Sequence, residues 1–409
     1  DPSPADPAAL HDPRAPRQLD NRDTIRNIAG ELTTPYGDLL MSLESGYKKV
    51  GIYYSRTADY LRERKPYKLT YLVEGLWVAC MRAGYPADFL YDQDIRDGDA
   101  MDYDAIFAPG WSYPGECPPE IRAQLENLVN AGKVVAVDRA SQLPIEGVTK
   151  LDSNLDEYDD KLGGAFPRYV DFESEMVWNR SEKTTELVKD FLSEHIEPAA
   201  RHDALVGPDW LKSGKGHYMV MPNFAFTRFH GLYKTLYQAP DRPYLEFPER
   251  PSVCYDMLEM KRVPVEKDGD WMSMRADFRH YPGKIYAFLP AEIDRVIVRS
   301  TPRLTAGADL QFSVEVADDD GDRIDAGFPL EMTIVAPDGR RHHHVYRAAT
   351  PVFRDAWRVP VNAPEGTWEL QVRELISGTV GVAEVSVEGA EFPGGDLDER
   401  RVITHGQSG

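Results

Sequence analysis

The chain has 409 residues, of which 42% are hydrophobic and 28% are charged, and it carries a formal net charge of −21. The composition excludes a disordered chain, and the length predicts about two to four domains, because one hydrophobic core rarely serves so many residues. The negative charge, with no Lys/Arg-rich run to offset it, excludes a surface that attracts nucleic acid or anionic lipid. No stretch approaches the roughly 20 apolar residues that a membrane span needs, so no membrane span is expected.

Residues 1–17 are rich in Pro, Asp and Ala and predict an extended arm, and weak helical periodicity follows, with a turn at 33–37. The start lacks Met, a basic segment and an apolar signal core, which indicates a removed leader or a piece of a longer chain. Cys80, Cys117 and Cys254 are too few and too scattered for a disulfide framework. Cys80 falls in a helical apolar pattern and is expected in the core.

Strand and helix patterns alternate over the next segment. Alternation at this short spacing predicts right-handed crossovers and a parallel sheet covered by helices. Strands are predicted at 49–55, 87–90, 103–110 and 133–138, and helices at 69–83, 118–131 and 181–195, with a strand at 202–206 completing the domain.

After Gly216 the pattern changes to the apolar–polar alternation of antiparallel strands. The predicted strands at 217–222, 252–258 and 284–289 form a small sheet. From Asp294 short strands recur between turns, which is typical of an immunoglobulin-like β-sandwich. These strands are predicted at 294–300, 309–317, 329–336, 341–347, 367–374 and 379–387.

The predicted fold class is therefore a three-layer α/β domain with a parallel sheet, plus a C-terminal all-β immunoglobulin-like sandwich. The domain boundaries follow from these composition changes. We expect an N-terminal arm with helices at 1–46, an α/β domain at 47–210, a small β domain at 211–292, the sandwich at 293–389, and a tail at 390–409.

The segment from Val50 to Asp138 resembles the class I glutamine amidotransferase-like fold, and most closely the trimerisation domain of family 42 β-galactosidases. The resemblance lies in the strand 50–55, the run 104–110, and the helix, turn and strand of 125–138. The stretches 253–263 and 287–290 are similar to the small β domain that follows in such glycosidases. These motifs concern packing, so the resemblance implies a fold more than a function.

An amidotransferase has a nucleophilic Cys at the sharp turn after the strand that matches residues 134–137, with a His as base. Asp138 takes the Cys position here, the flanking glycines are missing, and no His lies nearby in sequence. Acyl transfer needs nucleophile and base together, so we expect no catalytic residues at this turn and lean toward a non-enzyme. The resemblance implies instead a role in oligomer assembly.

Trp111, Tyr113 and Glu116 follow a predicted parallel strand, at the edge where open α/β sheets bind ligands. With Asp138 and Arg139 they form a candidate ligand site, in which aromatic faces could stack on a sugar ring. The alternative is that these aromatic side chains pack in the core or in an interface.

Cys117 lies nearby and precedes a predicted helix that could lower its thiol pKa. A reactive thiol would also need a partner base, and none is visible in the sequence. The alternative is a loop cysteine at the start of a helix.

Asp318, Asp320 and Asp322 surround one glycine and are candidate calcium ligands, because calcium prefers closely spaced oxygen atoms. The spacing does not match an EF-hand, so the alternative is a solvated β-turn. His342 and His344 would share one face of a strand and could bind a metal together, although no third ligand is visible. Apart from this possible calcium ion, no cofactor is expected.

Two functional hypotheses follow. The first is a non-catalytic assembly or carbohydrate-associated binding module, as a homo-oligomer or a subunit of a larger assembly in an extracytoplasmic location (periplasm, cell surface or secreted). The alternative is the C-terminal portion or a subunit of a glycoside hydrolase whose catalytic barrel lies elsewhere. A weaker third possibility is a hydrolase with an unfamiliar site near Trp111 and Cys117.

Overall fold

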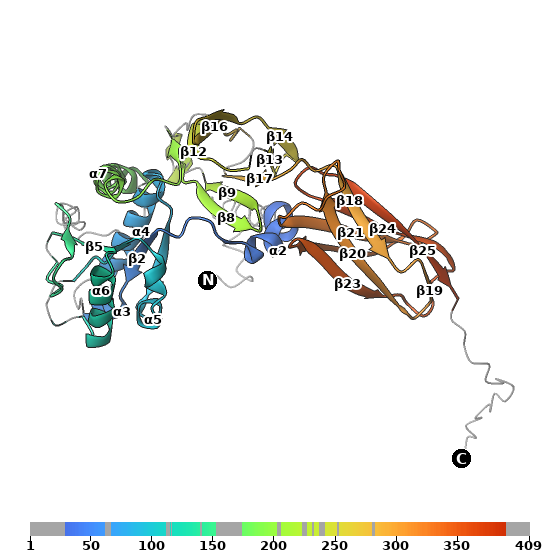
Figure 1. Ribbon diagram of the computed structural model, residues 1–409, viewed down its shortest axis with the longest axis horizontal. Helices are drawn as coiled ribbons and strands as arrows, with labels where there is room; N and C mark the ends of the chain where they lie inside the picture. The colour runs from blue at the N-terminus through green and yellow to red at the C-terminus, as the bar shows by residue number, and fades with distance from the viewer. Residues whose placement is uncertain are drawn as a thin grey trace, which may run out of the picture. The chain divides into compact units, whose positions relative to one another are not determined.

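The computed structural model describes residues 29–61, 67–111, 115, 117–139, 141–152, 174–202, 206–222, 227–230, 233–236, 242–251, 253–279 and 283–389 (Figure 1). The chain divides into two compact units. One unit is the continuous segment Leu43–Ala291. The other combines the segment that ends at Ser42 with the segment that starts at Glu292.

A five-stranded parallel sheet forms the first part of the Leu43–Ala291 unit. Its strand order is β3-β2-β4-β5-β6, and every neighbouring pair is parallel. The apolar runs Val50–Tyr54 and Val134–Val137 are typical of parallel strands that are buried on both faces. The parallel sheet predicted from the sequence is confirmed. Its strands are β2 (Val50–Tyr54), β3 (Ala87–Tyr91), β4 (Ala105–Phe107), β5 (Val134–Val137) and β6 (Thr149–Lys150).

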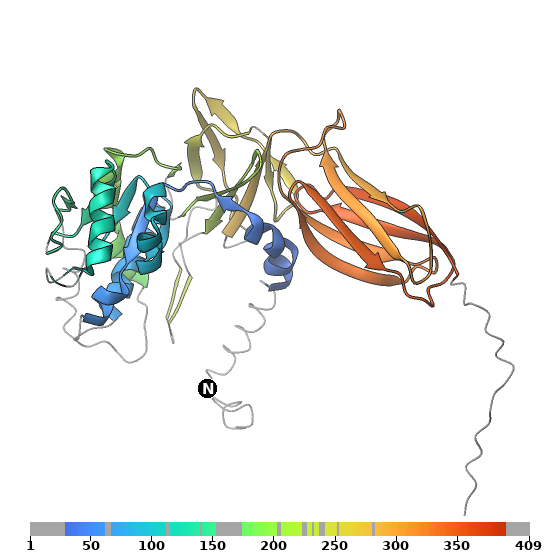
Figure 2. The same ribbon diagram turned by 60° about the horizontal axis from the view of Figure 1, so that its bottom comes forward.

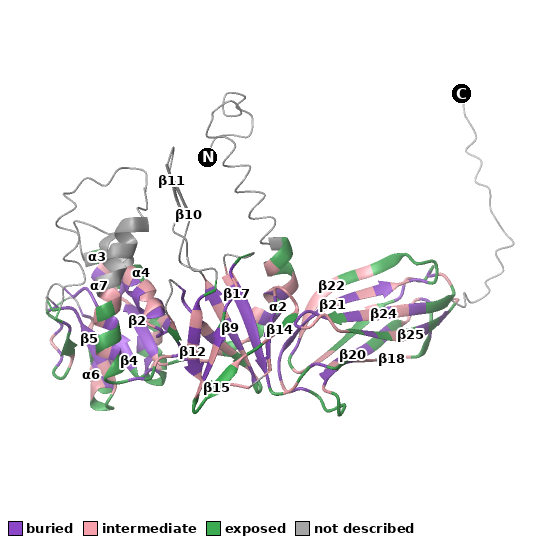
Figure 3. Cartoon of the chain, turned by 90° about the horizontal axis from the view of Figure 1, so that it is seen from above, coloured by how far each residue is buried: buried purple, intermediate pink, exposed green. Residues whose placement is uncertain are grey.

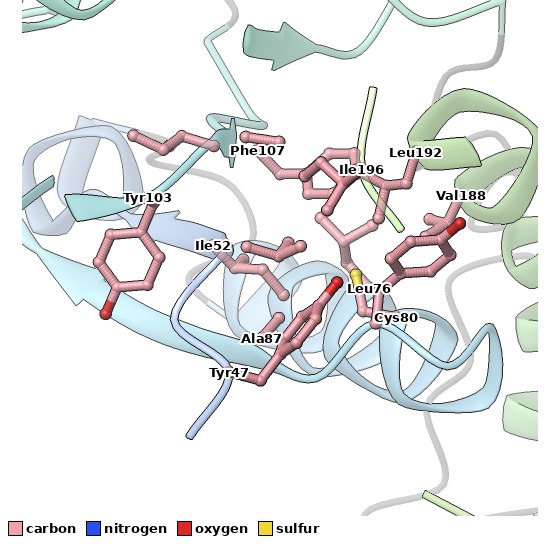
Figure 4. Packing of buried hydrophobic residues seen from close by; sticks show 14 of the residues in the cluster. Tyr47, Ile52, Leu76, Cys80, Ala87, Tyr103, Phe107, Val188, Leu192 and Ile196 are labelled. Atoms are coloured by element: carbon pink, nitrogen blue, oxygen red, sulfur yellow. The ribbon is translucent and has the colours of Figure 1, made fainter. Parts of the chain in front are cut away.

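Helices cover both faces of this sheet. Helix α4 packs against α7, and α5 packs against α6. The two pairs lie on opposite faces, because right-handed crossovers from β2 to β3 and from β3 to β4 run in opposite directions along the sheet. Figure 4 shows core side chains contributed by the strands, by α4 and by α7. The helices are α3 (Arg56–Leu61), α4 (Tyr67–Arg82), α5 (Asp92–Asp97), η3 (Asp99–Asp102), α6 (Pro119–Asn130) and α7 (Ser174–Ser193).

Two antiparallel sheets and a hairpin make up the rest of this unit. Trp210, Phe247 and Phe288 form the centre of this part, with ring centroids 5.2 to 5.4 Å apart. The six-stranded sheet runs β1 (Glu44–Ser45), β8 (Asp209–Ser213), β9 (Gly216–Pro222), β17 (Gly283–Leu289), β13 (Val253–Asp256) and β14 (Lys261–Val263). The four-stranded sheet runs β15 (Glu266–Asp268), β16 (Trp271–Arg275), β12 (Tyr244–Pro248) and β7 (Arg201–His202), and the hairpin is β10 (Thr227–His230) with β11 (Tyr233–Leu236).

The predicted strand at 202–206 does not complete the parallel sheet. Residues 203–205 lie outside the described residues, and β7 is only two residues long and pairs antiparallel with β12. The fifth strand of the parallel sheet is β6, which the sequence pattern missed. A short strand carries no sequence signal for its partner, so the prediction was wrong about the sheet to which it belongs.

The two parts of this unit share one hydrophobic core. Tyr47, Leu192 and Ile196 belong to the same buried cluster as Trp210 and Phe288. The indole Nε1 of Trp210 donates a hydrogen bond of 3.0 Å to the carbonyl of Ala199. The antiparallel sheets therefore pack against the amino edge of the parallel sheet, meaning the edge at which its strands begin.

The second unit is a β-sandwich of two facing sheets (Figure 2). Along β20 buried residues alternate with more exposed ones, which places one face of the strand in the core (Figure 3). The predicted sandwich is confirmed, and β19 and β23 are additional strands. One sheet runs β18 (Arg295–Ser300), β20 (Asp309–Ala317) and β23 (Val352–Arg358), and the other runs β19 (Arg303–Thr305), β25 (Val380–Glu388), β24 (Gly366–Glu374), β21 (Phe328–Val335) and β22 (Arg341–Ala349).

A helix from the N-terminal segment completes the sandwich unit. After the short π-helix η2 (Ala29–Thr33), helix α2 (Thr34–Ser42) packs on β21 and β22. The hydroxyl of Tyr36 donates a hydrogen bond of 3.5 Å to the carbonyl of Leu375, and Asp38 lies 3.8 Å from Arg347. The predicted turn at 33–37 is therefore wrong: Pro35 lies in the first turn of a helix, where its missing N–H costs nothing. No helix within the described residues is long and apolar enough to span a membrane.

Candidate functional site

Polar side chains gather at the carboxyl edge of the parallel sheet, where its strands end. The described residues include six buried polar side chains, and three of them, Ser55, Asp138 and Ser141, lie at this edge. The strand order reverses between β2 and β4, and ligands of open α/β sheets bind at the carboxyl ends of the strands beside such a reversal. This edge is therefore the candidate site that both the sequence and the topology indicate.

Asp138 follows β5 and is only 3% exposed. The backbone N–H of Gly110, a residue with φ of 95°, donates to its Oδ1 at 3.3 Å. The backbone carbonyl of Asp138 accepts a hydrogen bond of 3.0 Å from the N–H of Ser141. A buried carboxylate is costly unless it accepts hydrogen bonds, so this arrangement uses Asp138 to join the turns that follow β4 and β5.

Trp111 lies beside this carboxylate and is fully buried. Its ring centroid is 6.1 Å from that of Tyr53, and its carbonyl accepts a hydrogen bond of 2.9 Å from the N–H of Gln142. Its indole Nε1 is buried and has no hydrogen-bond partner among the described residues. The ring is thus packed among protein atoms at this edge.

The other predicted ligand residues are distributed differently. Arg139 is exposed, and its Nη1 donates a hydrogen bond of 3.3 Å to the carbonyl of Asp152. Tyr113 and Glu116 lie outside the described residues. The structure therefore brings Trp111, Asp138 and Arg139 to one edge of the sheet.

The Cys117 thiol lies buried just before α6. Burial raises its pKa to about 12, although the nearby charge of Arg122 acts in the opposite direction. Its Sγ lies 3.7 Å from the carbonyl of Pro118. A thiol that stays protonated at neutral pH is a poor nucleophile.

Histidine is missing from this whole region of the sequence. No His occurs between His11 and His195, a segment that contains every strand of the parallel sheet and helices α3 to α7. His195 follows α7 and is exposed, with its ring 5.2 Å from that of Phe191. The segment that supplies the sheet and its helices therefore offers no imidazole base for general acid–base catalysis.

Sequence reasoning missed three polar residues at the ends of β2 and β3. The hydroxyl of Tyr53 donates a hydrogen bond of 2.6 Å to Asp92 Oδ1, and burial raises the pKa of this phenol. Ser55 Oγ accepts a hydrogen bond of 3.1 Å from the N–H of Ala58 at the start of α3. Tyr53 and Ser55 lie at the end of the strand predicted at 49–55, and Asp92 lies just after the strand predicted at 87–90, and this position at strand ends was the signal that could have identified them.

The side chain and carbonyl of Asp318 hydrogen-bond to the backbone of the acidic turn at 318–322 in the sandwich unit. Asp318 Oδ1 accepts a hydrogen bond of 2.8 Å from the N–H of Asp322, and the carbonyl of Asp318 accepts one of 3.1 Å from the N–H of Gly321. Asp320 and Asp322 are exposed. These bonds account for the turn without a metal, as expected for an aspartate-rich turn.

The two candidate metal-binding histidines also contact protein groups. His344 Nε2 lies 2.9 Å from Glu331 Oε1, and the His342 ring centroid is 4.8 Å from that of Trp368. Over the part of the chain that the structure describes, no group of three or more His, Cys, Asp or Glu side chains is placed to hold a metal ion.

Comparisons with known proteins give limited information. No family model and no curated protein sequence matches the chain. Similar solved structures include a CARDB domain from Pyrococcus furiosus, at 14% identity and a TM-score of 0.18, covering 24% of this chain and 91% of that one. Another is the PKD domain of an M14-like peptidase from a Thermoplasmatales archaeon, at 14% identity and a TM-score of 0.15, covering 24% of this chain and 98% of that one. A third is trypsin-activated alpha-2-macroglobulin from Escherichia coli, at 12% identity and a TM-score of 0.21, covering 42% of this chain and 15% of that one. At TM-scores of 0.15 to 0.21 these similarities identify neither a fold nor a role, and the resemblance to amidotransferases and family 42 β-galactosidases stays a prediction.

Proposed function

We propose that this chain is a non-catalytic assembly module with a degenerate amidotransferase-like domain, working in an extracytoplasmic, carbohydrate-handling or cell-surface complex. The observation that carries the proposal is the state of the turn after β5. There the buried carboxylate of Asp138 accepts a backbone hydrogen bond, and no histidine occurs between His11 and His195, the segment that contains the parallel sheet and helices α3 to α7. Acyl transfer needs a nucleophile and a base together, and neither is in place.

The outer edge of β3 is the surface proposed for contacts between copies of the chain. β3 is the edge strand of the parallel sheet, and Phe89 and Tyr91 on it are 37% and 45% exposed. Phe89 stacks on Trp77 with ring centroids 6.1 Å apart, which extends the aromatic surface onto α4. An apolar edge strand is a template for pairing with another chain, and this strand carries no Lys or Pro to prevent that pairing.

Light scattering coupled to size-exclusion chromatography, over a range of protein concentrations, tests the assembly role. We expect an oligomer that Phe89→Lys weakens at least about tenfold, because a charge would be desolvated in the contact. Val361→Lys is the matched control, since Val361 is 62% exposed and belongs to the sandwich unit. A strict monomer at high concentration, or an oligomer that Phe89→Lys leaves intact, would contradict the proposal.

Turnover assays test the non-catalytic part of the proposal separately. We expect no hydrolysis across a panel of glycosides and amides. Turnover that disappears in Cys117→Ala would overturn the proposal, because it would assign a reactive thiol to the carboxyl edge of the sheet.

A further inference from the structure

A cavity of about 400 Å³ lies at the amino edge of the parallel sheet, opposite the site described above. The residues that lead into β2 and β4 form one wall, and the segments after α7 and after β12 form the other. All of them belong to the Leu43–Ala291 unit. The residues used below are Gly46, Tyr47, Lys49, Asp104, Glu197 and Arg250.

Two cations in this cavity lack a carboxylate partner among the described residues. Lys48 forms an ion pair with Asp102 at 2.7 Å, and Asp104 is paired with Lys133 at 3.3 Å. Lys49 and Arg250 form no such pair within the described part of the chain. The lining also includes the Glu197 carboxylate. The two positive charges of Lys49 and Arg250 and the one negative charge of Glu197 therefore sum to one positive charge.

Arg250 is held rigidly against the wall of the cavity. Its guanidinium carbon lies 4.9 Å from the centroid of Trp210, and its Nη1 donates a hydrogen bond of 3.0 Å to the carbonyl of Glu249. Its Nε is buried and has no hydrogen-bond acceptor within the part of the chain that the structure describes. A buried donor without a partner costs free energy, and a bound acceptor would recover it.

The wall behind Arg250 is itself fixed. The carbonyl of Trp210 accepts a hydrogen bond of 2.6 Å from the N–H of Gly46, and a side chain at Gly46 would come within 2.9 Å of that carbonyl oxygen. A guanidinium stacked on a fixed indole loses little freedom when it binds a ligand, and this favours affinity.

A second buried polar atom without a partner among the described residues is Nδ1 of His217, on β9. Burial, followed by the nearby charges of Arg250 and Lys212, lowers the His217 pKa to about 4, so this imidazole adds no positive charge near Arg250 at pH 7.

We infer that this cavity binds a small organic monocarboxylate, with the carboxylate held by Arg250 and Lys49. The planar guanidinium matches a carboxylate through two parallel hydrogen bonds. One net positive lining charge suits one negative charge, whereas Glu197 would repel a phosphate dianion. The volume lies within the range of small-ligand sites and has room for a body the size of a sugar acid. This inference is independent of the assembly role.

Isothermal titration calorimetry at constant ionic strength tests the inference, with glucuronate as the probe, glucose as its neutral counterpart, and inorganic phosphate as a competing oxyanion. We expect saturable binding of glucuronate, none of glucose, and weaker binding of phosphate. Arg250→Gln should weaken glucuronate binding at least about tenfold and Lys49→Gln about threefold, because charge-assisted hydrogen bonds are lost. Arg96→Gln, on the exposed surface of α5, is the matched control and should change nothing.

Three outcomes would overturn the inference: no saturable glucuronate binding up to about 10 mM, equal binding by wild type and Arg250→Gln, or tighter binding of phosphate than of glucuronate. If Arg250→Gln does not fold, Lys49→Gln decides the question. Lys49 is only partly buried and its ammonium contacts the Tyr47 ring at 5.6 Å, so its loss should leave the fold intact.

Discussion

The carboxyl and amino edges of the parallel sheet differ in how their polar groups are satisfied. At the carboxyl edge, the Asp138 carboxylate accepts the Gly110 N–H, and the Trp111 carbonyl accepts the Gln142 N–H. At the amino edge, Lys49 and Arg250 face a cavity without carboxylate partners among the described residues. The carboxyl edge is joined by hydrogen bonds within the chain, although Trp111 Nε1 has no partner there among the described residues, and the amino edge presents two cations to a cavity.

The inferred carboxylate site would reverse the usual arrangement of an open α/β sheet, in which ligands bind at the carboxyl edge. The β sheets of the same unit would account for that reversal. They pack against the amino edge and add Trp210 and Arg250 as a second wall, which an isolated α/β domain would lack. A binding site at this edge therefore depends on the added domain rather than on the sheet alone.

The largest expected effect comes from a substitution that disrupts the packing at the amino edge of the sheet. Gly84 ends α4 with φ of 83°, and a Cβ there would overlap the carbonyl oxygen of Ala200. We expect Gly84→Ala to destabilise the Leu43–Ala291 unit by about 4 kcal/mol or to prevent its folding, because a backbone atom must move. Urea unfolding followed by tryptophan fluorescence measures this loss.

Gly132 provides the control for that experiment. It ends α6 with φ of 81°, and nothing lies within 4 Å of its missing Cβ. Gly132→Ala should cost only about 1 kcal/mol of left-handed strain. Equal losses in the two variants would mean that contact with Ala200 does not fix the amino edge.

The second effect breaks the carboxyl edge. Asp138→Ala leaves the Gly110 N–H buried without its acceptor and opens a small void, so we expect a loss of about 3 kcal/mol. Asp138→Asn keeps an oxygen at the acceptor position and should cost about 1 kcal/mol. Urea unfolding of both variants checks this, with Asp320→Ala in the exposed sandwich turn as a control. Equal costs for Ala and Asn would show that the acceptor oxygen is unimportant.

The third effect is a dependence of stability on pH that comes from Asp209 at the start of β8, in the same unit. Burial raises the Asp209 pKa from 3.8 to about 6. Since the folded state binds this proton more tightly, the stabilisation is complete below about pH 4 and is lost as pH rises through 6. Asp209→Asn keeps the acceptor for the Trp210 N–H and should stabilise the unit by about 2 kcal/mol at pH 7. Thermal unfolding between pH 4 and 7 measures it.

His217 acts in the opposite direction over nearly the same pH range. Its folded pKa of about 4 lies below the unfolded value of 6.5, so its stabilisation is lost as pH falls between these values. In Asp209→Asn only the His217 contribution remains, so the stability of this variant should rise from pH 4 to 6.5. Adding His217→Gln should remove this dependence of stability on pH. If the stability of Asp209→Asn does not change between pH 4 and 6.5, the opposing effects of Asp209 and His217 are contradicted.

Local patterns predicted four of the five strands of the parallel sheet, six of the eight sandwich strands, and helices α4, α6 and α7, but they missed helices α2, α3 and α5 and strands β12, β15 and β16 of the four-stranded sheet. The apolar run at 134–137 and the helix at 119–130 lie where periodicity and the Pro and Gly signals placed them. The edge of the sheet at which Asp138 would lie also followed from the strand pattern. These features depend on residues close together in sequence, which is why a single sequence specifies them.

Pairing across long sequence distances was not predictable. Helix α2 packs on strands more than 280 residues away, and β1 pairs with β8. The short or partly polar strands β7, β8 and β23 carry weak patterns. The amino-edge cavity combines Lys49 with Arg250, and only the fold brings these two residues together. No spacing rule in the sequence could have connected them.

The smallest expected effect tests whether the carboxyl edge is only one residue short of catalysis. Asp138→Cys would place a thiol at the position that the resemblance proposed from the sequence matches to the amidotransferase nucleophile. We expect no glutaminase or thioesterase activity and no rapid alkylation by iodoacetamide. The position is only 3% exposed, and the chain between His11 and His195 contains no imidazole that could act as the base. Cys117 is the internal control, since burial already raises its pKa to about 12. Turnover by Asp138→Cys would mean that this edge retains a working oxyanion site. A single substitution would then be enough to make the carboxyl edge catalytic.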